Sequence, residues 1–238
     1  MDEFMACEAA YRNGKAAGYK EGIQNAGGYE IPGCSCVSNA MVYGLENSIK
    51  RAKYPMSVHV DTVSGVLTDG IKKLAMSERG AGHDQFLTGI IVQFDLTFTN
   101  KAFVEAERYH FLDFVSSQST MHRITKFDLD KAYDSHVDPR IVAIMKEKVS
   151  EYNDLPSDCD GDLKAEKYLE ILYSNPAGFK LTAGMTTNYR QLKTIYAQRR
   201  THRLPEWRKF CKWIETLPMS FLITGKEPEV ENGTQKEN

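Results

Sequence analysis

The sequence lacks a long apolar run. No stretch approaches the roughly 20 residues that a membrane-spanning helix needs. Its start, MDEFMACEAAYRNGK, has no apolar segment after a basic region, which a secretory signal would require. These absences argue against a membrane or secreted protein, so we expect a cytoplasmic protein without a membrane partner.

Cysteine is scarce, and its five copies are scattered along the chain. Cys34 and Cys36 form a C-x-C pair, whereas zinc sites usually use C-x2-C together with a second pair of ligands. No histidine pair completes such a site. We predict free or structural thiols, as in a reducing compartment, with metal binding as the minor alternative.

An excess of charge is also missing, because the formal net charge is −2. No overall field draws the chain to nucleic acid or membrane, so an anion site must come from local clustering. The 42% hydrophobic and 26% charged residues are ordinary for a globular protein. We expect a single domain over residues 1–224 and a disordered polar tail over residues 225–238.

Residues 89–99 give the clearest secondary-structure signal. Ile90, Val92, Phe94, Leu96 and Phe98 alternate with more polar side chains, which predicts a half-buried strand. A glycine-rich loop follows the first predicted helix, an acidic loop covers 153–162, and one or two helices are expected within 38–76. Further helices are predicted at residues 3–17, 101–115, 139–152, 162–173, 188–201 and 205–217.

The helix predicted at 188–201 places an arginine on its apolar side. Tyr189, Leu192, Ile195 and Tyr196 share one stripe with Arg199, while Arg190 lies on the opposite face. A buried guanidinium is costly unless an anion meets it. A structural carboxylate, a guanidinium extended to the edge of the stripe, and a ligand phosphate all remain open.

Basic residues concentrate around this helix. A nucleic-acid surface is a rival interpretation, although Tyr189 and Tyr196 look like core residues and not a stacking platform. Only Glu206 and Glu215 oppose the basic side chains of residues 188–215, which are Arg190, Lys193, Arg199, Arg200, Arg203, Arg208, Lys209 and Lys212.

These residues resemble motifs of the flavin-dependent thymidylate synthases. Asn188-Tyr189-Arg190 is similar to that family's Asn-x-Arg, and Arg199 falls where the family has its nucleotide-binding helix arginine. Glu206-Trp207-Arg208 resembles the downstream Gln-Trp-Glu segment with a one-residue shift. Pro176 stands twelve residues before Asn188, as does the proline of the family's Leu-Pro turn.

The resemblance extends upstream and covers residues 82–217. Gly82-His83-Asp84 is similar to the family's Gly-His-Glu, and Arg108-Tyr109-His110 stands where Arg-His-Arg is expected. Gln118-Ser119 resembles the nucleotide-contacting stretch. Met121-His122 replaces the family's Arg-Tyr, with Arg123 adjacent, and Leu172 occupies the position of a second nucleotide arginine.

The resemblance implies an α+β fold, with a curved, mostly antiparallel sheet packed with helices. It implies reductive methylation of dUMP to dTMP, using FAD, NADPH and methylenetetrahydrofolate, in a homotetramer with sites at subunit interfaces. The implied flavin-binding residues are His83, Arg108, His110, Asn188 and Arg190. The implied nucleotide-binding residues are Gln118, Ser119, Arg123 and Arg199, of which Ser119 and Arg199 are the candidate catalytic residues.

Three other functions remain open at this stage. The altered motif is compatible with a related pyrimidine nucleotide modification, such as hydroxymethylation. A catalytically inactive nucleotide-binding homologue is the second possibility. A nucleic-acid-binding module using the basic helices is the third possibility.

Overall fold

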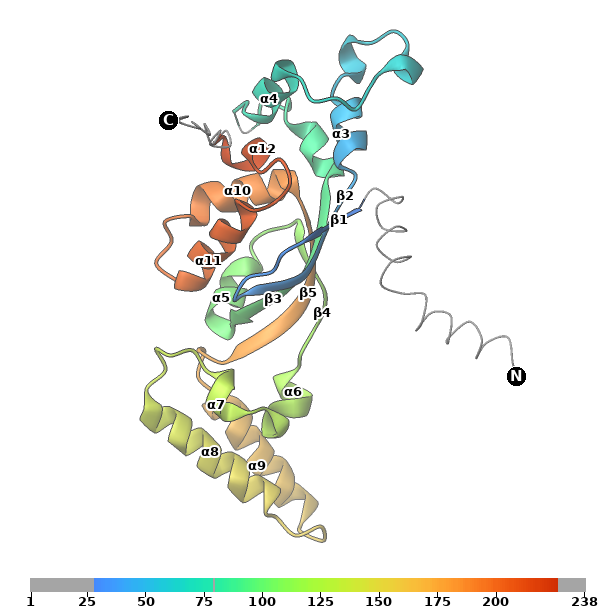
Figure 1. Ribbon diagram of the computed structural model, residues 1–238. Helices are drawn as coiled ribbons and strands as arrows, with labels where there is room; N and C mark the ends of the chain where they lie inside the picture. The colour runs from blue at the N-terminus through green and yellow to red at the C-terminus, as the bar shows by residue number, and fades with distance from the viewer. Residues whose placement is uncertain (1–27, 79, 227–238) are drawn as a thin grey trace, which may run out of the picture.

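The structure is a computed structural model that describes residues 28–78 and 80–226. A five-stranded sheet lies at its centre, with helices on one side and a helical hairpin at one end (Figure 1). The helix predicted at residues 3–17 and residues 227–238 of the predicted tail lie outside the described residues. No described helix is long and apolar enough to cross a membrane.

The described elements alternate between strands and helices along the chain. The strands are β1 (Gly28–Ile31), β2 (Val37–Tyr43), β3 (Ile91–Thr99), β4 (Leu112–Ser117) and β5 (Lys180–Asn188). The α-helices are α3 (Leu45–Arg51), α4 (Asp69–Ala75), α5 (Asn100–Ala106), α6 (Thr120–Arg123), α7 (Leu129–Ala132), α8 (Pro139–Asn153), α9 (Gly161–Ser174), α10 (Tyr189–Arg199), α11 (Pro205–Ile214) and α12 (Phe221–Thr224). Short 3-10 helices are η1 (Tyr54–Met56), η2 (Val60–Thr62), η3 (Gln85–Gly89) and η4 (Ile124–Lys126).

The sheet has the order β1-β2-β3-β5-β4, and every pair of neighbouring strands is antiparallel. The long β3 and β5 pair in continuous register, from Ile91 opposite Asn188 to Thr99 opposite Lys180. The strand predicted at residues 89–99 is confirmed as β3. The α+β fold with an antiparallel sheet is confirmed as well.

One face of the sheet carries the main core. Phe94 and Phe98 of β3 project from it and are buried against Trp207 and Phe210 of α11. The Phe98 and Trp207 rings meet edge to face with their centroids 5.0 Å apart, a geometry that aromatic pairs favour. This packing fixes α10 and α11 on the sheet and thereby sets where their side chains can act.

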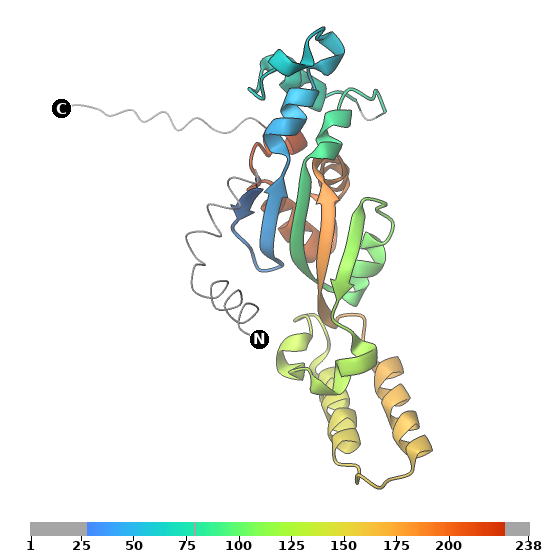
Figure 2. The same cartoon turned by 90° about the vertical axis from the view of Figure 1, so that its right-hand side faces the viewer.

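The opposite face of the sheet is polar. Figure 2 shows the five strands with no described helix in front of them. Hydroxyls of Thr97 and Thr182 hydrogen-bond across β3 and β5 at 2.8 Å, and Asn39 donates to Asp95 at 2.5 Å. The polar alternation of β3 therefore corresponds to an uncovered sheet face in the described part of the chain.

A second, smaller core holds the helical hairpin of α8 and α9. Phe179 is fully buried there, with the rings of Phe127 and Tyr133 edge-on to it. Asp138 caps α8 by accepting a hydrogen bond from the Arg140 amide, and Pro139 occupies the first turn. The helices predicted at 139–152 and 162–173 are confirmed.

The helix predicted at residues 101–115 is wrong beyond Ala106. The chain turns after α5 and continues as β4, because residues 112–117 complete the sheet beside β5. The prediction also missed β5. Within 38–76 the structure has α3 and α4, but that segment begins inside strand β2.

Candidate functional site

The first candidate site is a pocket of about 620 Å³ at the start of α10. We call it the α10 pocket. It lies where β5 ends and α10 begins, and η3 and the turn before β4 complete it. Its lining residues are Gly80, Asp84, Gln85, Thr88, Phe111, Asn188, Arg190, Gln191, Lys193, Thr194 and Ala197.

Asn188 makes the change from strand to helix. It ends β5 in extended backbone, and its Oδ1 accepts a 2.9 Å hydrogen bond from the Gln191 amide, which caps α10. The Nδ2 group has no protein partner in the described part of the chain. Asn188 therefore both starts the helix and offers a donor to the α10 pocket.

A buried carboxylate organises the cations of this pocket. Asp84 is 2% exposed and accepts from Arg190 Nε at 3.0 Å and from Lys193 Nζ at 2.9 Å. Burial alone would raise the pKa of Asp84, but hydrogen bonds from Lys193 and Arg190 outweigh it and lower the pKa. Two cations share one anion, so this cluster keeps a net positive charge toward the pocket.

The other predicted flavin-binding residues lie on the turns that border this pocket. His83 is exposed in the turn immediately before Asp84. Arg108 and His110 are exposed in the turn between α5 and β4, beside the pocket-lining Phe111. Thr187 Oγ1 donates to the Phe111 carbonyl at 2.6 Å and ties this turn to β5. Of the five predicted residues, Asn188 and Arg190 line the α10 pocket, whereas His83, Arg108 and His110 do not line it and only stand near lining residues in the sequence.

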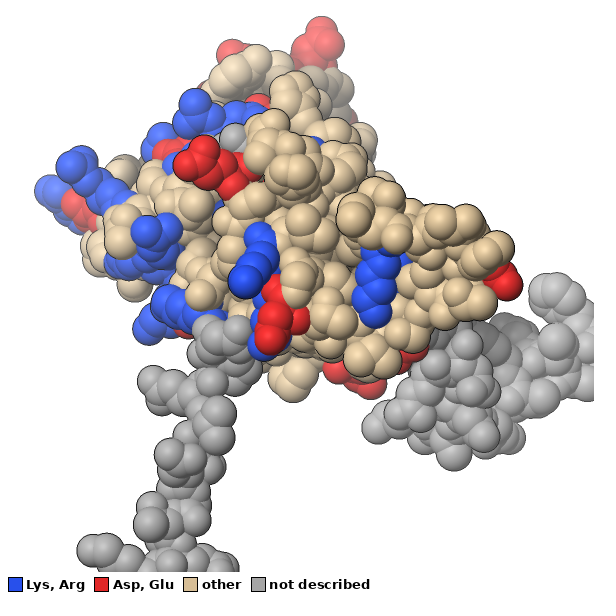
Figure 3. Space-filling view, turned by 90° about the horizontal axis from the view of Figure 1, so that it is seen from above, with Lys and Arg blue, Asp and Glu red and all other residues tan. Residues whose placement is uncertain are grey.

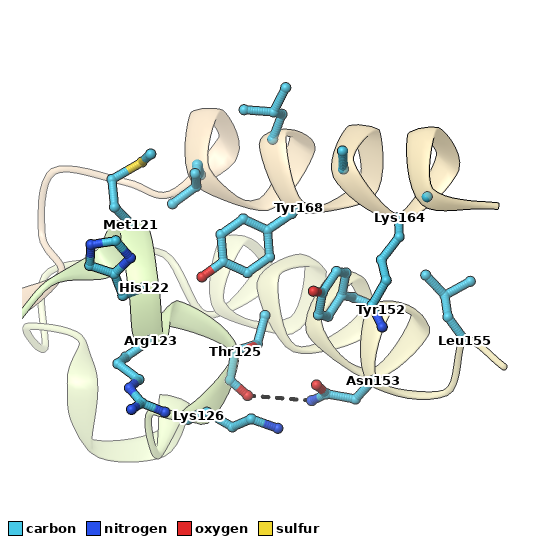
Figure 4. Close-up of a pocket in the computed structure, with 14 residues that line it drawn as sticks. Met121, His122, Arg123, Thr125, Lys126, Tyr152, Asn153, Leu155, Lys164 and Tyr168 are labelled. Carbon is cyan, nitrogen blue, oxygen red and sulfur yellow. Dashed lines mark hydrogen bonds between the residues drawn. The ribbon is translucent and has the colours of Figure 1, made fainter. Parts of the chain in front are cut away.

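The second candidate site is a pocket of about 780 Å³ between α6, η4 and the hairpin of α8 and α9 (Figure 4). We call it the hairpin pocket. Its lining residues are Met121, His122, Arg123, Thr125, Lys126, Tyr152, Asn153, Leu155, Gly161, Lys164, Ala165, Tyr168, Leu169 and Leu172.

The hairpin pocket combines basic side chains with two tyrosine rings. Arg123, Lys126 and Lys164 line it, no described acidic residue does, and none of the three makes an ion pair with a described residue. The rings of Tyr152 and Tyr168 lie 5.2 Å apart between the helices. Such a surface suits an anion that carries a flat ring.

The predicted nucleotide residues divide around the hairpin pocket. Arg123 lines it. Gln118 instead continues the sheet beside Thr182. Its side-chain Oε1 accepts a hydrogen bond from the backbone N–H of Thr182, and its backbone N–H donates to the Thr182 carbonyl, both at 2.9 Å. Ser119 precedes α6 and is half-buried, and its hydroxyl makes no capping hydrogen bond. Met121 and Leu172, which stand where the resembled family has nucleotide arginines, line this same pocket.

Arg199 lies in neither pocket. It is 5% exposed, its Nη1 donates to Glu105 at 2.7 Å, and its Nε donates to the Tyr109 hydroxyl at 2.7 Å. The guanidinium also lies over the Trp207 ring, 4.9 Å from the centroid. Of the alternatives that the sequence left open for the partner of Arg199, the structure supplies a protein carboxylate, that of Glu105. The hydrogen bond from Arg199 to Tyr109 also holds the turn that carries Arg108 and His110.

The two pockets lie toward opposite ends of β4. Phe111, which lines the α10 pocket, precedes the strand, and the residues of the hairpin pocket follow it. Six residues of strand span about 20 Å. The two pockets are therefore separated by about the length of β4.

Cysteine chemistry is separate from both pockets. The four described cysteines are free, and the sulfurs of Cys34 and Cys36 lie 3.4 Å apart in the turn between β1 and β2. Burial raises the pKa of Cys36 above its ordinary value. Within the described residues, no group of three or more His, Cys, Asp or Glu side chains is arranged for a metal ion.

Several pocket residues were not found from the sequence. The sequence indicates Asp84 only as part of a three-residue motif, because nothing in an aspartate beside a glycine-rich turn shows that it is buried. Lys126, Lys164 and Tyr168 gave no signal, because the hairpin brings together segments about 40 residues apart in the sequence. Lys193 was counted in the basic cluster, and that count was the available signal.

No protein-family model matches this chain, and no curated protein matches it. Solved structures do. A flavin-dependent thymidylate synthase, ThyX, from Helicobacter pylori in complex with FAD and dUMP has a TM-score of 0.56 and 14% identity, over 82% of this chain and 97% of that chain. A second Helicobacter pylori ThyX structure with FAD and dUMP gives 0.54 and 15%, over 82% and 96%. The chain has the ThyX fold, which confirms the resemblance at the level of the fold.

Proposed function

We propose that this chain is a flavin-dependent enzyme of the thymidylate synthase type, which methylates dUMP to dTMP. The carbon comes from methylenetetrahydrofolate, and NADPH reduces the flavin. The observation that carries the proposal is that predicted residues of the two kinds line different pockets: Asn188 and Arg190 for the flavin line the α10 pocket, and Arg123 for the nucleotide lines the hairpin pocket. The fold shared with ThyX, whose solved structures hold FAD and dUMP, supports the proposal.

The groups of the α10 pocket fit a flavin nucleotide. Arg190 and Lys193 supply positive charge for a phosphate, Asn188 supplies an amide donor, and Phe111 is an exposed ring that a flat ligand can cover. His83, Arg108 and His110 extend this set from the neighbouring turns. FAD would supply the hydride chemistry, while these residues bind and orient it.

The groups of the hairpin pocket fit a pyrimidine nucleotide. Arg123 and Lys126 would meet the phosphate and Tyr168 the base, while Gln118 and Ser119 precede the pocket-lining residues of α6 in the sequence. In this proposal Arg199 acts through Tyr109, because its side chain is buried and already bonded. It is a positioning residue for the turn that carries Arg108 and His110.

Hydride and carbon transfer require the flavin and the nucleotide to touch. The two pockets of one chain are about 20 Å apart along β4, and we infer that the α10 pocket of one subunit faces the hairpin pocket of another. A homotetramer with sites between subunits is therefore part of the proposal.

The test is flavin binding followed by turnover. We expect the protein to bind added FAD with a flavin absorption band, and Arg190→Ala to weaken binding at least tenfold, or about 1.4 kcal/mol. Arg140→Ala is the matched control, because Arg140 is an exposed arginine of α8 that pairs only with Asp138. Absence of FAD binding by the wild-type protein would contradict the proposal.

Release of tritium from dUMP labelled at carbon 5 then tests the chemistry. Release with dTMP as product supports the thymidylate synthase. Release with a hydroxymethylated nucleotide as product would show that the chain hydroxymethylates the pyrimidine and is not a thymidylate synthase. Binding of FAD and dUMP without release would make the chain an inactive nucleotide-binding homologue, and the apolar Met121 and Leu172 at the family's arginine positions are the observation that favours that outcome.

A further inference from the structure

The basic cluster of residues 188–215 does not act as one surface. Arg190 and Lys193 turn to Asp84 in the α10 pocket, and Arg199 is buried against Glu105. The remaining cations lie on the outer side of α10 and α11, away from the sheet. Seen from above, basic side chains gather at the side where Figure 1 places these two helices (Figure 3). The flavin and nucleotide pockets use none of them.

These outer cations surround a hollow of about 530 Å³ between α10 and α11, which we call the outer basic pocket. Among the described residues, Glu215 is the one acidic residue in its lining. Glu206, in the first turn of α11, faces the sheet, where it accepts a 2.7 Å hydrogen bond from Thr99. The basic residues that line the pocket are Arg200, Arg208, Lys209, Lys212 and Lys226.

Glu215 does not neutralise this pocket. Its Oε1 accepts from the Tyr196 hydroxyl at 2.5 Å and from Lys226 Nζ at 3.1 Å, so it is committed to one wall. Lys209 and Lys212 make no ion pair with a described residue, although they lie one turn apart on the exposed side of α11. The lining that the structure describes therefore holds an uncompensated positive charge at close spacing.

Two arginines of this pocket are held in place by the backbone. Arg208 Nη1 donates to the carbonyls of His202 and Arg203 at 2.5 and 2.7 Å, and Arg200 Nη1 donates to the Ala197 carbonyl at 3.0 Å. The Nε and Nη2 groups of both have no hydrogen-bond partner among the described residues. An arginine fixed through one nitrogen loses less side-chain entropy when its other donors meet a ligand.

The lining selects among anions. Tyr196 is the one aromatic residue among the described lining residues, it is buried, and Arg200 and Lys226 already lie 5.9 and 5.8 Å from its ring centroid. Bases of nucleic acid would thus find no stacking platform. No large hydrophobic side chain of α10 or α11 is exposed, which disfavours insertion into a lipid surface. Arginine forks together with lysines at short spacing match phosphate oxygens.

We propose that the outer basic pocket binds a phosphate chain of three or four negative charges, either inorganic triphosphate or the triphosphate of a nucleotide. The site is separate from the two pockets of the proposed function. It recognises the phosphates and leaves the base without contacts.

The test is calorimetric titration of the full-length protein at about 0.15 M salt, near physiological ionic strength. The probes are inorganic triphosphate, a nucleoside triphosphate and a single-stranded DNA oligomer. We expect both triphosphates to bind with affinities within a few-fold of each other. The double variant Arg200→Ala, Arg208→Ala should weaken both at least tenfold, while FAD binding stays unchanged.

A charge-matched control is Lys131→Ala, Arg140→Ala, which removes two exposed basic residues from the hairpin end of the molecule. It should leave triphosphate binding unchanged. An equal loss in both double variants would overturn the proposal in favour of a general charge effect. Absence of triphosphate binding, or binding of the DNA oligomer alone, would also overturn it, whether or not FAD binds.

Discussion

At the scale of single residues, charged side chains that share one helix have different partners. Arg190 is 34% exposed at the side chain and bonds to Asp84, whereas Arg199 is almost fully buried and bonds to Glu105. The sequence indicated that Arg199 needed an anion. It could not indicate which one, because Glu105 stands 94 residues earlier and only the packing of α5 on the sheet brings it there.

Replacing Glu105 by Gln should destabilise the fold. The change leaves the Arg199 guanidinium buried without its carboxylate, and we expect the free energy of unfolding to fall by about 2–3 kcal/mol in urea denaturation. Arg140→Ala breaks an exposed ion pair and should have no measurable effect. A loss in Glu105→Gln no larger than that of the control would show that Arg199 does not depend on this carboxylate.

Asp84 should make stability depend on pH. Its folded-state pKa is lowered, so the stability it contributes is present above its ordinary pKa of 3.8 and is lost as pH falls through the lower folded value. The difference in unfolding free energy between the wild type and Asp84→Asn should therefore be constant from about pH 5 to 7 and shrink below about pH 4. Urea denaturation across this range measures it, and a difference that does not change with pH would contradict the assignment.

At the scale of elements, the sequence predicted those helices and strands that carry a clear hydrophobic period or a clear end signal of their own. Strand β3 and helices α8 to α11 follow from their own alternation or from caps and prolines. Strand β5 was missed because Gly184 and the small residues around it weaken the alternation of Leu181, Ala183 and Met185. Strand β4 was read as helix because its exposed edge position leaves no buried face to repeat every second residue.

Asn188 joins an element to the site, and two substitutions separate its roles. Asn188→Ala removes the cap of α10 and should cost about 1 kcal/mol of stability, while Asn188→Ser keeps a capping oxygen and most of that stability. Both remove the amide Nδ2 that faces the α10 pocket. Equal weakening of FAD binding in both variants, beside unequal stability, is the expected pattern. If FAD binding follows stability instead, Asn188 is a cap without a ligand contact.

At the scale of the whole molecule, sequence patterns alone did not predict the order of the strands in the sheet. Local signals and a family resemblance predicted an α+β protein. The sheet order β1-β2-β3-β5-β4 depends on pairings between distant segments, which no local window contains. The separation of the two pockets corresponds to the length of β4, and the proposed arrangement of sites between subunits rests on it.

Mixing two defective variants should therefore restore activity. Arg190→Ala damages the α10 pocket, and Arg123→Ala damages the hairpin pocket. If each site combines the α10 pocket of one chain with the hairpin pocket of another, random co-assembly should recover roughly a quarter of the sites. Tritium release from co-expressed and separately expressed variants measures this. Mixed oligomers without recovered activity would place both ligands on one chain.

Helix α10 contributes a wall to the α10 pocket with its first turns and to the outer basic pocket with its last. Thermodynamic linkage then constrains the two sites together. Whatever factor a bound phosphate chain applies to the flavin dissociation constant, the flavin must apply to the dissociation constant of the phosphate chain. The two sites share one helix of eleven residues, about 16 Å long. The coupling free energy between them is therefore a single quantity, and a titration of either ligand in the presence of the other determines it.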